Sequence, residues 1–327
     1  YISDLTVLND HLYFSAYDAV NGQELWRTDG TPSGTTMVKN METGSEYSNP
    51  ANLTVFNNQL YFSATTAEDG NELWRTDGTP EGTFMVKDIS PESSGSYPSK
   101  LIEFDNQLYF SASTKETGDE LWRTDGTESG TVLVKDINTG FLNSKPTNFK
   151  TFNKLLYFIA TTNEFGEELW RTDGTSNGTL MVKDIYEGKE SSSPTEFIEF
   201  DNQLYFRAQN VTTGIELWRT DGTSNGTTLL KDINEGKTSS NPQNLATFNN
   251  QLYFGANNSL GEIALWRSDG TSIGTTLIKE LSSDQTSNYP FNFTKFNDLI
   301  YFGASNGTNG TELWLTDGTA SNTKMLI

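Results

Sequence analysis

Four charged residue types recur at a fixed spacing and are the main candidates for chemistry. In their second occurrence they are Glu72, Arg75, Asp77 and Lys87. Alternation along a strand places Glu72 and Arg75 on opposite faces, so each partner must come from another strand or another sheet. We expect structural ion pairs, because a carboxylate that recurs in every repeat lacks the uniquely tuned partner that acid–base catalysis needs. The alternative is a multivalent binding site.

The aspartate of each Asp-Gly-Thr triplet makes calcium a candidate cofactor, since hard cations prefer carboxylate and carbonyl oxygens. Asp77, Asp125 and Asp173 are weak candidates. No Asp-x-Asp-x-Asp-Gly loop is present, and an Asp before Gly in a turn needs no metal to explain it. We therefore expect no cofactor and keep calcium as the alternative.

Composition excludes several classes of protein. The 327 residues hold 43 Asp and Glu against 22 Lys and Arg, giving a formal net charge of -21, with no cysteine and a single histidine, His11. Disulfides, thiolate metal sites and Cys nucleophiles are excluded, and so are multi-His zinc sites and most Ser/His/Asp machinery. Nucleic acid and anionic membranes repel an acidic chain, and the longest apolar run, 155–160, is too short to span a bilayer. We expect no nucleic-acid partner and no direct membrane insertion.

A repeat of 48 residues organises the whole sequence, and this signal takes precedence over local patterns. The tryptophans mark it without any insertion: Trp26, Trp74, Trp122, Trp170, Trp218, Trp266 and Trp314. Prolines such as Pro50 and Pro98 keep the same spacing.

Each repeat predicts four short strands and no helix, from its apolar alternation and turn residues. In the second repeat we expect strands near 53–56, 60–64, 72–76 and 83–89, with turns at Asn57-Asn58 and at Asp77-Gly78-Thr79. The second and fourth strands are apolar on both faces, which predicts a sheet covered on both sides. The fold class predicted is all-β, a seven-bladed β-propeller with four antiparallel strands per repeat, in a single domain over 1–327. A solenoid is disfavoured because the terminal repeats lack the atypical polar caps of an open array.

The motif Glu-Leu-Trp-x-x-Asp-Gly-Thr-x-x-Gly-Thr, nearly verbatim in six repeats, resembles the ELWxxDGT repeat family of bacterial secreted and cell-surface proteins, and the likeness covers essentially the whole chain. The resemblance implies export, a propeller-like fold and covalent linkage to further domains of a larger surface protein. It implies no known ligand. Late repeats depart from the pattern at Ala264, Leu315 and Asn322. The Leu-Trp position is also similar to WD-repeat propellers, which implies that the first strand of each blade is innermost.

Each tryptophan is predicted to lie buried between adjacent blades. Burial of about 150–250 Å² per indole corresponds to about 4–6 kcal/mol before entropy is counted. The alternative is a set of aromatic platforms for sugars. Removing Trp170 is expected to cost roughly 3–5 kcal/mol of stability. The sequence leaves open whether residues 1–8 begin the first blade or complete the last.

The repeats differ most in two connections, which we expect to emerge on the same side of each blade and to form the recognition face. These are the loop between the second and third strands and the connection to the next blade. Aromatic residues mark this candidate binding face: Tyr17, Tyr47, Tyr97, Phe141, Phe165, Tyr186 and Tyr289. Such rings can stack on sugars or anchor a protein partner.

The function predicted from these features is a non-enzymatic, extracellular or cell-surface module for adhesion, assembly or protein interaction, with a protein, matrix or glycan partner. A lectin that uses the loop aromatics is the alternative. A calcium-stabilised scaffold or an enzyme is a weaker alternative, and no catalytic residue is assigned.

Overall fold

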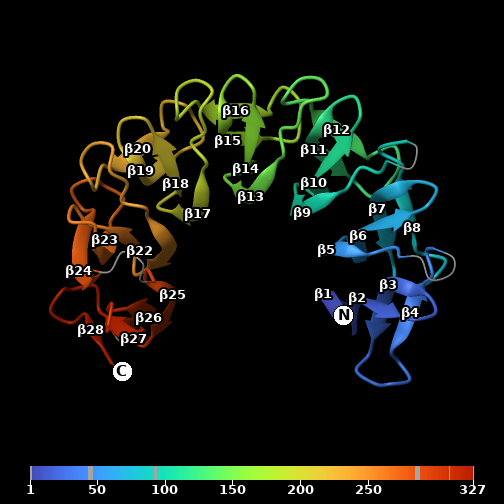
Figure 1. Cartoon of the computed structure of the whole chain (residues 1–327), viewed down its shortest axis with the longest axis horizontal. Coiled ribbons are helices and arrows are strands. Elements are labelled where there is room, and N and C mark those ends of the chain that lie inside the picture. The colour runs from blue at the N-terminus through green and yellow to red at the C-terminus, as the bar shows by residue number, and fades with distance from the viewer. Residues whose placement is uncertain (1, 43–46, 92–93, 284–287, 309, 327) are drawn as a thin grey trace. The chain divides into compact units, whose positions relative to one another are not determined.

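The computed structural model describes residues 2–42, 47–91, 94–283, 288–308 and 310–326. The chain is all-β and forms seven four-stranded antiparallel sheets, one for each 48-residue repeat (Figure 1). These sheets are the blades of a seven-bladed β-propeller, as the sequence predicts. No helix occurs among the described residues.

Every blade is built from four consecutive strands, paired in the order of the sequence. Blade 1 comprises β1 (Ile2–Leu8), β2 (His11–Asp18), β3 (Gly22–Thr28) and β4 (Thr36–Lys39). Blade 2 comprises β5 (Ala51–Phe56), β6 (Gln59–Thr66), β7 (Gly70–Thr76) and β8 (Phe84–Lys87). Blade 3 comprises β9 (Ser99–Phe104), β10 (Gln107–Thr114), β11 (Gly118–Thr124) and β12 (Val132–Lys135). Blade 4 comprises β13 (Thr147–Phe152), β14 (Leu155–Thr162), β15 (Gly166–Thr172) and β16 (Leu180–Lys183).

The remaining blades follow the same plan. Blade 5 comprises β17 (Thr195–Phe200), β18 (Gln203–Asn210), β19 (Gly214–Thr220) and β20 (Thr228–Lys231). Blade 6 comprises β21 (Gln243–Phe248), β22 (Gln251–Asn257), β23 (Ile263–Ser268) and β24 (Thr276–Ser282). Blade 7 comprises β25 (Phe291–Phe296), β26 (Leu299–Ser305), β27 (Thr311–Thr316) and β28 (Lys324–Met325). Residues 2–8 pair with β2, so they begin the first blade.

The chain divides into two compact units, described separately below. Unit 1 contains residues 1–163 and 172–179, and unit 2 contains residues 164–171 and 180–327. The single domain over 1–327 stays a prediction.

The first strands of successive blades are neighbours within each unit. In unit 1, β1 contacts β5, β5 contacts β9, and β9 contacts β13, while in unit 2 β17 contacts β21 and β21 contacts β25. This arrangement agrees with an innermost first strand. A β-bulge interrupts each of these strands, as between Ala51 and Thr54, where Asn52 has a φ of 59°. Asn tolerates this left-handed conformation better than most residues.

The hairpin that opens each of blades 2 to 6 turns on two residues of positive φ. Asn57 and Asn58 have φ values of 47° and 59°, the combination of a type I′ turn, which favours Asn and matches the twist of the flanking strands. The turn predicted at this pair is confirmed.

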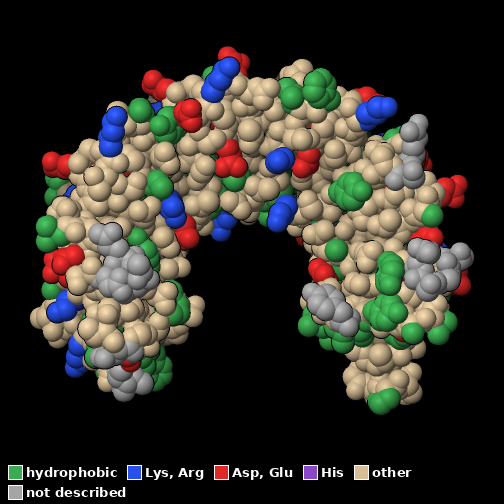
Figure 2. Space-filling view, viewed as in Figure 1, with side chains coloured by type: hydrophobic (Ala, Val, Ile, Leu, Met, Phe, Trp, Pro, Cys, Tyr) green, Lys and Arg blue, Asp and Glu red, His purple; other side chains and the backbone are tan. Residues whose placement is uncertain are grey.

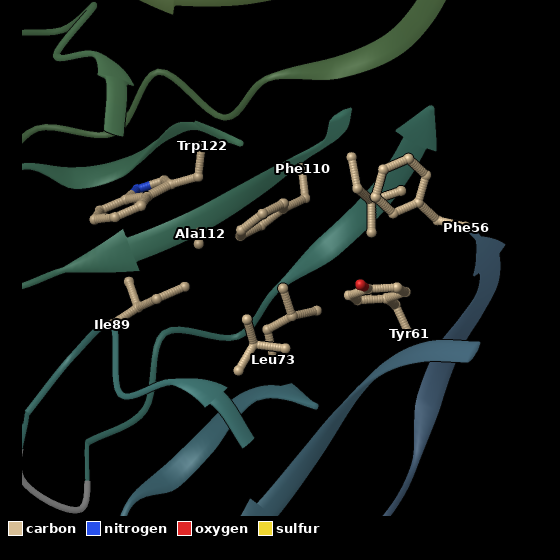
Figure 3. Close-up of a cluster of buried hydrophobic side chains, with 9 residues drawn as sticks. Phe56, Tyr61, Leu73, Ile89, Phe110, Ala112 and Trp122 are labelled. Carbon is tan, nitrogen blue, oxygen red and sulfur yellow. The ribbon is translucent and has the colours of Figure 1, made fainter. Parts of the chain in front are cut away.

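Tryptophan fills the space between blades within a unit. Trp122 of β11 packs in one cluster with Leu73 and Ile89 of blade 2 and with Phe110 of its own blade (Figure 3). Equivalent clusters hold Trp74, Trp266 and Trp314. Burial between blades is thereby confirmed for these four, whereas Trp26 of blade 1 is only half-buried.

The fourth strand differs from the prediction that it is apolar and covered on both faces. In β8 only Val86 is buried, and Phe84 is exposed beneath the guanidinium of Arg75, which lies 4.6 Å from the ring centroid. The reason is position, because this strand lies at the edge of its sheet opposite the first strand, and neighbouring blades contact each other mainly through their first strands. The second strand is covered as predicted, since most of β6 is buried.

Candidate functional site

The two variable connections lie together, and we call the surface that they form the loop side. The connection after β8 returns to the start of β7, where the backbone amides of Ser96 and Tyr97 donate to the carbonyl of Asn71, at 2.8 and 3.0 Å. The amide of Ser113, in the next blade, donates to the carbonyl of Ser96 at 2.8 Å. The predicted shared side of these connections is confirmed.

A buried glutamate holds each of the connections after blades 1 to 5 in place. Oε2 of Glu120, in β11, accepts hydrogen bonds from the amide of Ile137 at 2.8 Å and from the hydroxyl of Ser144 at 2.7 Å. Its Oε1 accepts from the amides of Asn138 and Ser144, at 3.2 and 3.1 Å. The side chain has no exposed surface, so its carboxyl group acts as an internal clamp for the connection.

Burial raises the pKa of this glutamate and of its equivalents. Desolvation raises the pKa of Glu72, Glu120, Glu168 and Glu216 to about 7, against opposing hydrogen bonds from a serine hydroxyl and from backbone amides. Loss of water disfavours the charged form more strongly than these donors favour it. Four internal groups therefore change charge near neutral pH.

The charged set expected to form ion pairs is satisfied largely by neutral groups. Nζ of Lys87 donates to the carbonyl of Thr131 in the next blade at 2.9 Å. Nη1 of Arg219 donates to the carbonyl of Gly270, also in the next blade, at 2.8 Å. Backbone carbonyls are available at every repeat, whereas the glutamate is committed to its own connection. The lysine and the arginine of this set therefore link neighbouring blades.

The aspartates considered for calcium organise their own turns. Oδ1 of Asp77 accepts from the amide of Thr79 at 2.8 Å and from its hydroxyl at 2.7 Å, and these bonds lower the pKa of Asp77. A Cβ on Gly82 would lie 2.1 Å from that oxygen, which explains the second glycine of the motif. Asp125 and Asp173 make the same bonds to Thr127 and Thr175.

Metal coordination by these turns stays a prediction. Within the described ranges, no group of three or more His, Cys, Asp or Glu side chains is placed to hold a metal ion.

Four of the seven predicted aromatic residues are exposed on the loop side of unit 1. Tyr17 and Tyr47, each 49% exposed, stack with ring centroids 6.0 Å apart and an interplanar angle of 24°. Tyr97 is 65% exposed and Phe141 is 78% exposed. Residues 43–46, which precede Tyr47 in its connection, lie outside the described residues.

The other three aromatic residues are half-buried. The hydroxyl of Tyr289 donates to Oδ1 of Asn257 at 3.1 Å, and its ring lies against Gly255, where a Cβ would meet it. Tyr289 therefore covers its blade. Phe165 and Tyr186 are likewise less accessible than the unit 1 rings.

Carboxylates outnumber lysines in the described connections that carry the exposed rings of unit 1. Asp18, next to Tyr17, accepts hydrogen bonds from the side chain and backbone of Asn21 and from the amide of Val20, which lower its pKa and keep it ionised. Among the described residues, the acidic residues in or at the ends of these connections are Asp18, Glu42, Glu68, Asp69, Asp88, Glu116 and Asp136. The lysines there are Lys115 and Lys145. Figure 2 shows acidic and hydrophobic side chains interspersed over the face that it draws.

Sequence reasoning missed the serine that completes each glutamate clamp. A signal was present, because a serine stands two residues before the repeated proline, as Ser96 does before Pro98 and Ser144 before Pro146. It also missed Asn234, a buried side chain in the blade 5 connection.

Comparison with known proteins gives structural likenesses only. No protein-family model matches the chain, and no curated protein sequence matches it. A puromycin hydrolase structure is 12% identical, with a TM-score of 0.46 over 99% of this chain and 53% of that one. Oligopeptidase B from Leishmania major is 10% identical, with a TM-score of 0.49 over 99% of this chain and 48% of that one. This chain therefore spans about half the length of these two proteins.

A separate propeller domain is also similar. The β-propeller domain of the Trilobed protease from Pyrococcus furiosus is 13% identical, with a TM-score of 0.40 over 100% of this chain and 97% of that one.

These findings correct the predicted function. The prediction of an adhesion, assembly or protein-interaction module of a bacterial surface protein is wrong, because the structural neighbours are peptidases and a propeller domain of a protease. The absence of catalysis and the extracellular location stay predictions. The sequence motif did not indicate this structural likeness, because the chain is only 10% identical in sequence to oligopeptidase B. Over the described residues, no helix has the length and apolar character needed to cross a membrane.

Proposed function

We propose that the loop side of unit 1 binds cationic peptide segments rich in lysine or arginine. The single observation that carries this proposal is the exposed, stacked pair Tyr17 and Tyr47. The ionised Asp18 follows Tyr17 in the sequence, at the end of the same strand. An aromatic face attracts ammonium and guanidinium groups at a cost in desolvation that a nearby carboxylate offsets. The pair offers an apolar surface for an aliphatic stem and a negative field for its charged end.

Charge over the whole chain supports the same ligand class. A formal net charge of -21 attracts basic partners over distances of about one Debye length, about 8 Å at physiological ionic strength. Tyr97 and Phe141 extend the exposed aromatic surface within unit 1. Such a surface binds an extended basic segment through several weak contacts.

We also propose that this chain binds without catalysing a reaction. The repeated carboxylates are committed to structure: Glu120 clamps its connection, and Asp77 closes its turn. The motif supports membership of the ELWxxDGT repeats, and an extracellular location is proposed on that resemblance.

Fluorescence anisotropy with a labelled hexalysine peptide tests the proposal. We expect binding that weakens with added salt, with no binding of a hexaglutamate peptide. The double variant Tyr17→Ala/Tyr47→Ala should bind at least about tenfold more weakly, because each ring contributes roughly 0.5–2 kcal/mol.

The matched control is Phe296→Ala, which removes an exposed ring at the end of β25, away from the loop side. It should bind like the unaltered protein. Binding that is absent, independent of salt, or equally weakened by both variants would overturn the proposal.

A further inference from the structure

Asn234, in the connection after blade 5, occupies the position in its repeat that Asn138 occupies after blade 3. The two side chains differ in the hydrogen-bond partner of Oδ1. Asn138 stands two repeats earlier, and both side chains are clamped through Nδ2, which donates to the carbonyl of Asn143 at 3.0 Å and to that of Ser239 at 3.2 Å, respectively. Both are buried, and Asn234 is only 3% exposed. The clamp fixes the orientation of each amide, so each Oδ1 is presented in one direction.

The oxygen of Asn138 has a protein donor, and the oxygen of Asn234 does not. Oδ1 of Asn138 accepts from the amide of Asn163, which follows the second strand of the next blade, at 3.2 Å. Among the described residues, no donor reaches Oδ1 of Asn234, although the atom is buried. Leaving such an acceptor unpaired costs free energy, so a donor from outside the chain is favoured there.

A change in the next blade explains the difference. In blade 6, β22 ends at Asn257, and Asn258 uses its Oδ1 to accept from the amides of Leu260 and Glu262, both at 2.9 Å. This loop is therefore closed on itself by Asn258. Ser259, which is equivalent to Asn163, is exposed instead of supplying its amide to Asn234.

Asn234 is one of the residues that line a cavity of about 450 Å³, together with Ile233, Glu235, Thr238 and Ser259. Its polar lining consists of a carboxylate, an amide and two hydroxyl groups. Lys237 belongs to the same connection but not to the lining. A ligand that matches this cavity carries N–H donors and positive charge on an aliphatic stem that Ile233 can contact.

We propose that this cavity of unit 2 binds a primary alkylammonium group, with Oδ1 of Asn234 and the carboxylate of Glu235 as its acceptors. The site is separate from the aromatic surface of unit 1. It rests on the proposed function only in sharing the class of ligand, since a lysine side chain presents this group.

Titration with n-butylammonium chloride tests the site directly, with binding followed by calorimetry and by the ¹⁵N–¹H resonances of the Asn234 side-chain amide. We expect saturable shifts of these resonances, and no such shifts with n-butanol, which has the same stem without the charge. Asn234→Ala should weaken binding at least about tenfold, because it removes a hydrogen bond to a charged group.

Asn138→Ala is the matched control, since it removes the same Nδ2 clamp from an asparagine whose oxygen is already paired. It should leave n-butylammonium affinity unchanged. Ser259→Tyr, at an exposed position, fills the cavity without altering Asn234 and should abolish binding in a protein of unchanged circular dichroism.

The proposal is overturned if n-butylammonium produces no saturable shift, if n-butanol produces the same shift, or if Asn138→Ala and Asn234→Ala weaken binding equally. Hexalysine anisotropy measured in parallel separates the two proposals. Loss of peptide binding with intact n-butylammonium binding would reject only the unit 1 surface, and the reverse result would reject only this cavity.

Discussion

The hydroxyl oxygen of Ser96 lies 2.5 Å from Oε2 of Glu72, a fully buried carboxyl group 24 residues earlier in the chain. In the next repeat the hydroxyl of Ser144 approaches both Oε2 of Glu120, at 2.7 Å, and the carbonyl of Asp119, at 3.3 Å. A hydroxyl can donate to a carboxylate, or accept from a carboxylic acid while donating to the carbonyl. The connection can thus keep this hydrogen-bonded geometry in either charge state of the glutamate.

The raised pKa of the buried glutamates should make the stability of the protein depend on pH near neutrality. Burial raises the pKa of Glu72 to about 7 from 4.5, so the folded chain binds more protons than the unfolded chain between these values. Its contribution is fully present below about pH 4.5 and is lost as the pH rises through 7. We expect the thermal midpoint to rise as the pH is lowered from 8 to 5.5.

The control for this pH dependence compares the same Glu→Gln substitution at a buried and at an exposed glutamate. Glu120→Gln removes a buried titrating group and should flatten the profile, whereas Glu116→Gln removes an exposed charge from a neighbouring loop and should leave its slope unchanged. Equal slopes for the unaltered protein and for Glu120→Gln would contradict the assignment.

Removing a tryptophan between blades should destabilise the protein. Trp122→Ala is expected to lower the free energy of unfolding by about 3–5 kcal/mol, since it leaves a cavity beside Leu73 and Ile89. Denaturant titration measures the loss. Trp26→Ala is the comparison, because Trp26 is half-buried and should cost clearly less; similar losses for both would argue against packing between blades as the role of Trp122.

The Asp-Gly-Thr turns are expected to need no metal. Asp77→Asn keeps an oxygen that can accept from the amide and hydroxyl of Thr79, so stability should change little, whereas Asp77→Ala should cost about 0.5–2 kcal/mol, as for a lost cap. A chelator should leave the melting midpoint unchanged. A fall in the midpoint with chelator, restored by added calcium, would instead establish calcium binding.

The lysine that links blades supplies a further test. Lys87→Met retains most of the aliphatic stem but loses the donor to the carbonyl of Thr131, and should destabilise unit 1 by about 1–3 kcal/mol. Lys115→Met, at an exposed loop position, should have almost no effect. Urea denaturation of the two variants distinguishes a link between blades from a surface charge.

Local sequence was sufficient to predict the blades. The spacing from Trp74 to Trp122 determines the repeat, and Asn57-Asn58 places the hairpin, because both signals act within one repeat. The expected strand at 60–64 lies inside β6, and that at 72–76 lies inside β7. The bulge at Asn52 was not predicted, since its backbone conformation depends on pairing with β6.

The candidate site was predicted less completely, because its contacts join residues far apart in the chain. The aromatic positions were predicted from variation between repeats, but the stacking of Tyr17 on Tyr47 depends on the path of a connection. Glu72 was expected in an ion pair, and its partner Ser96 becomes evident only when the connection returns to the blade. The unpaired oxygen of Asn234 depends on a change in the next repeat that alternation does not reveal.

Hydrogen–deuterium exchange of the protein with and without hexalysine tests the central claim most directly. The account predicts slower exchange in the loop-side segments 17–21, 67–71 and 138–143, with the Asp-Gly-Thr turn at 77–79 unchanged. Protection confined to that turn, or to no segment of unit 1 at saturating peptide, would contradict it.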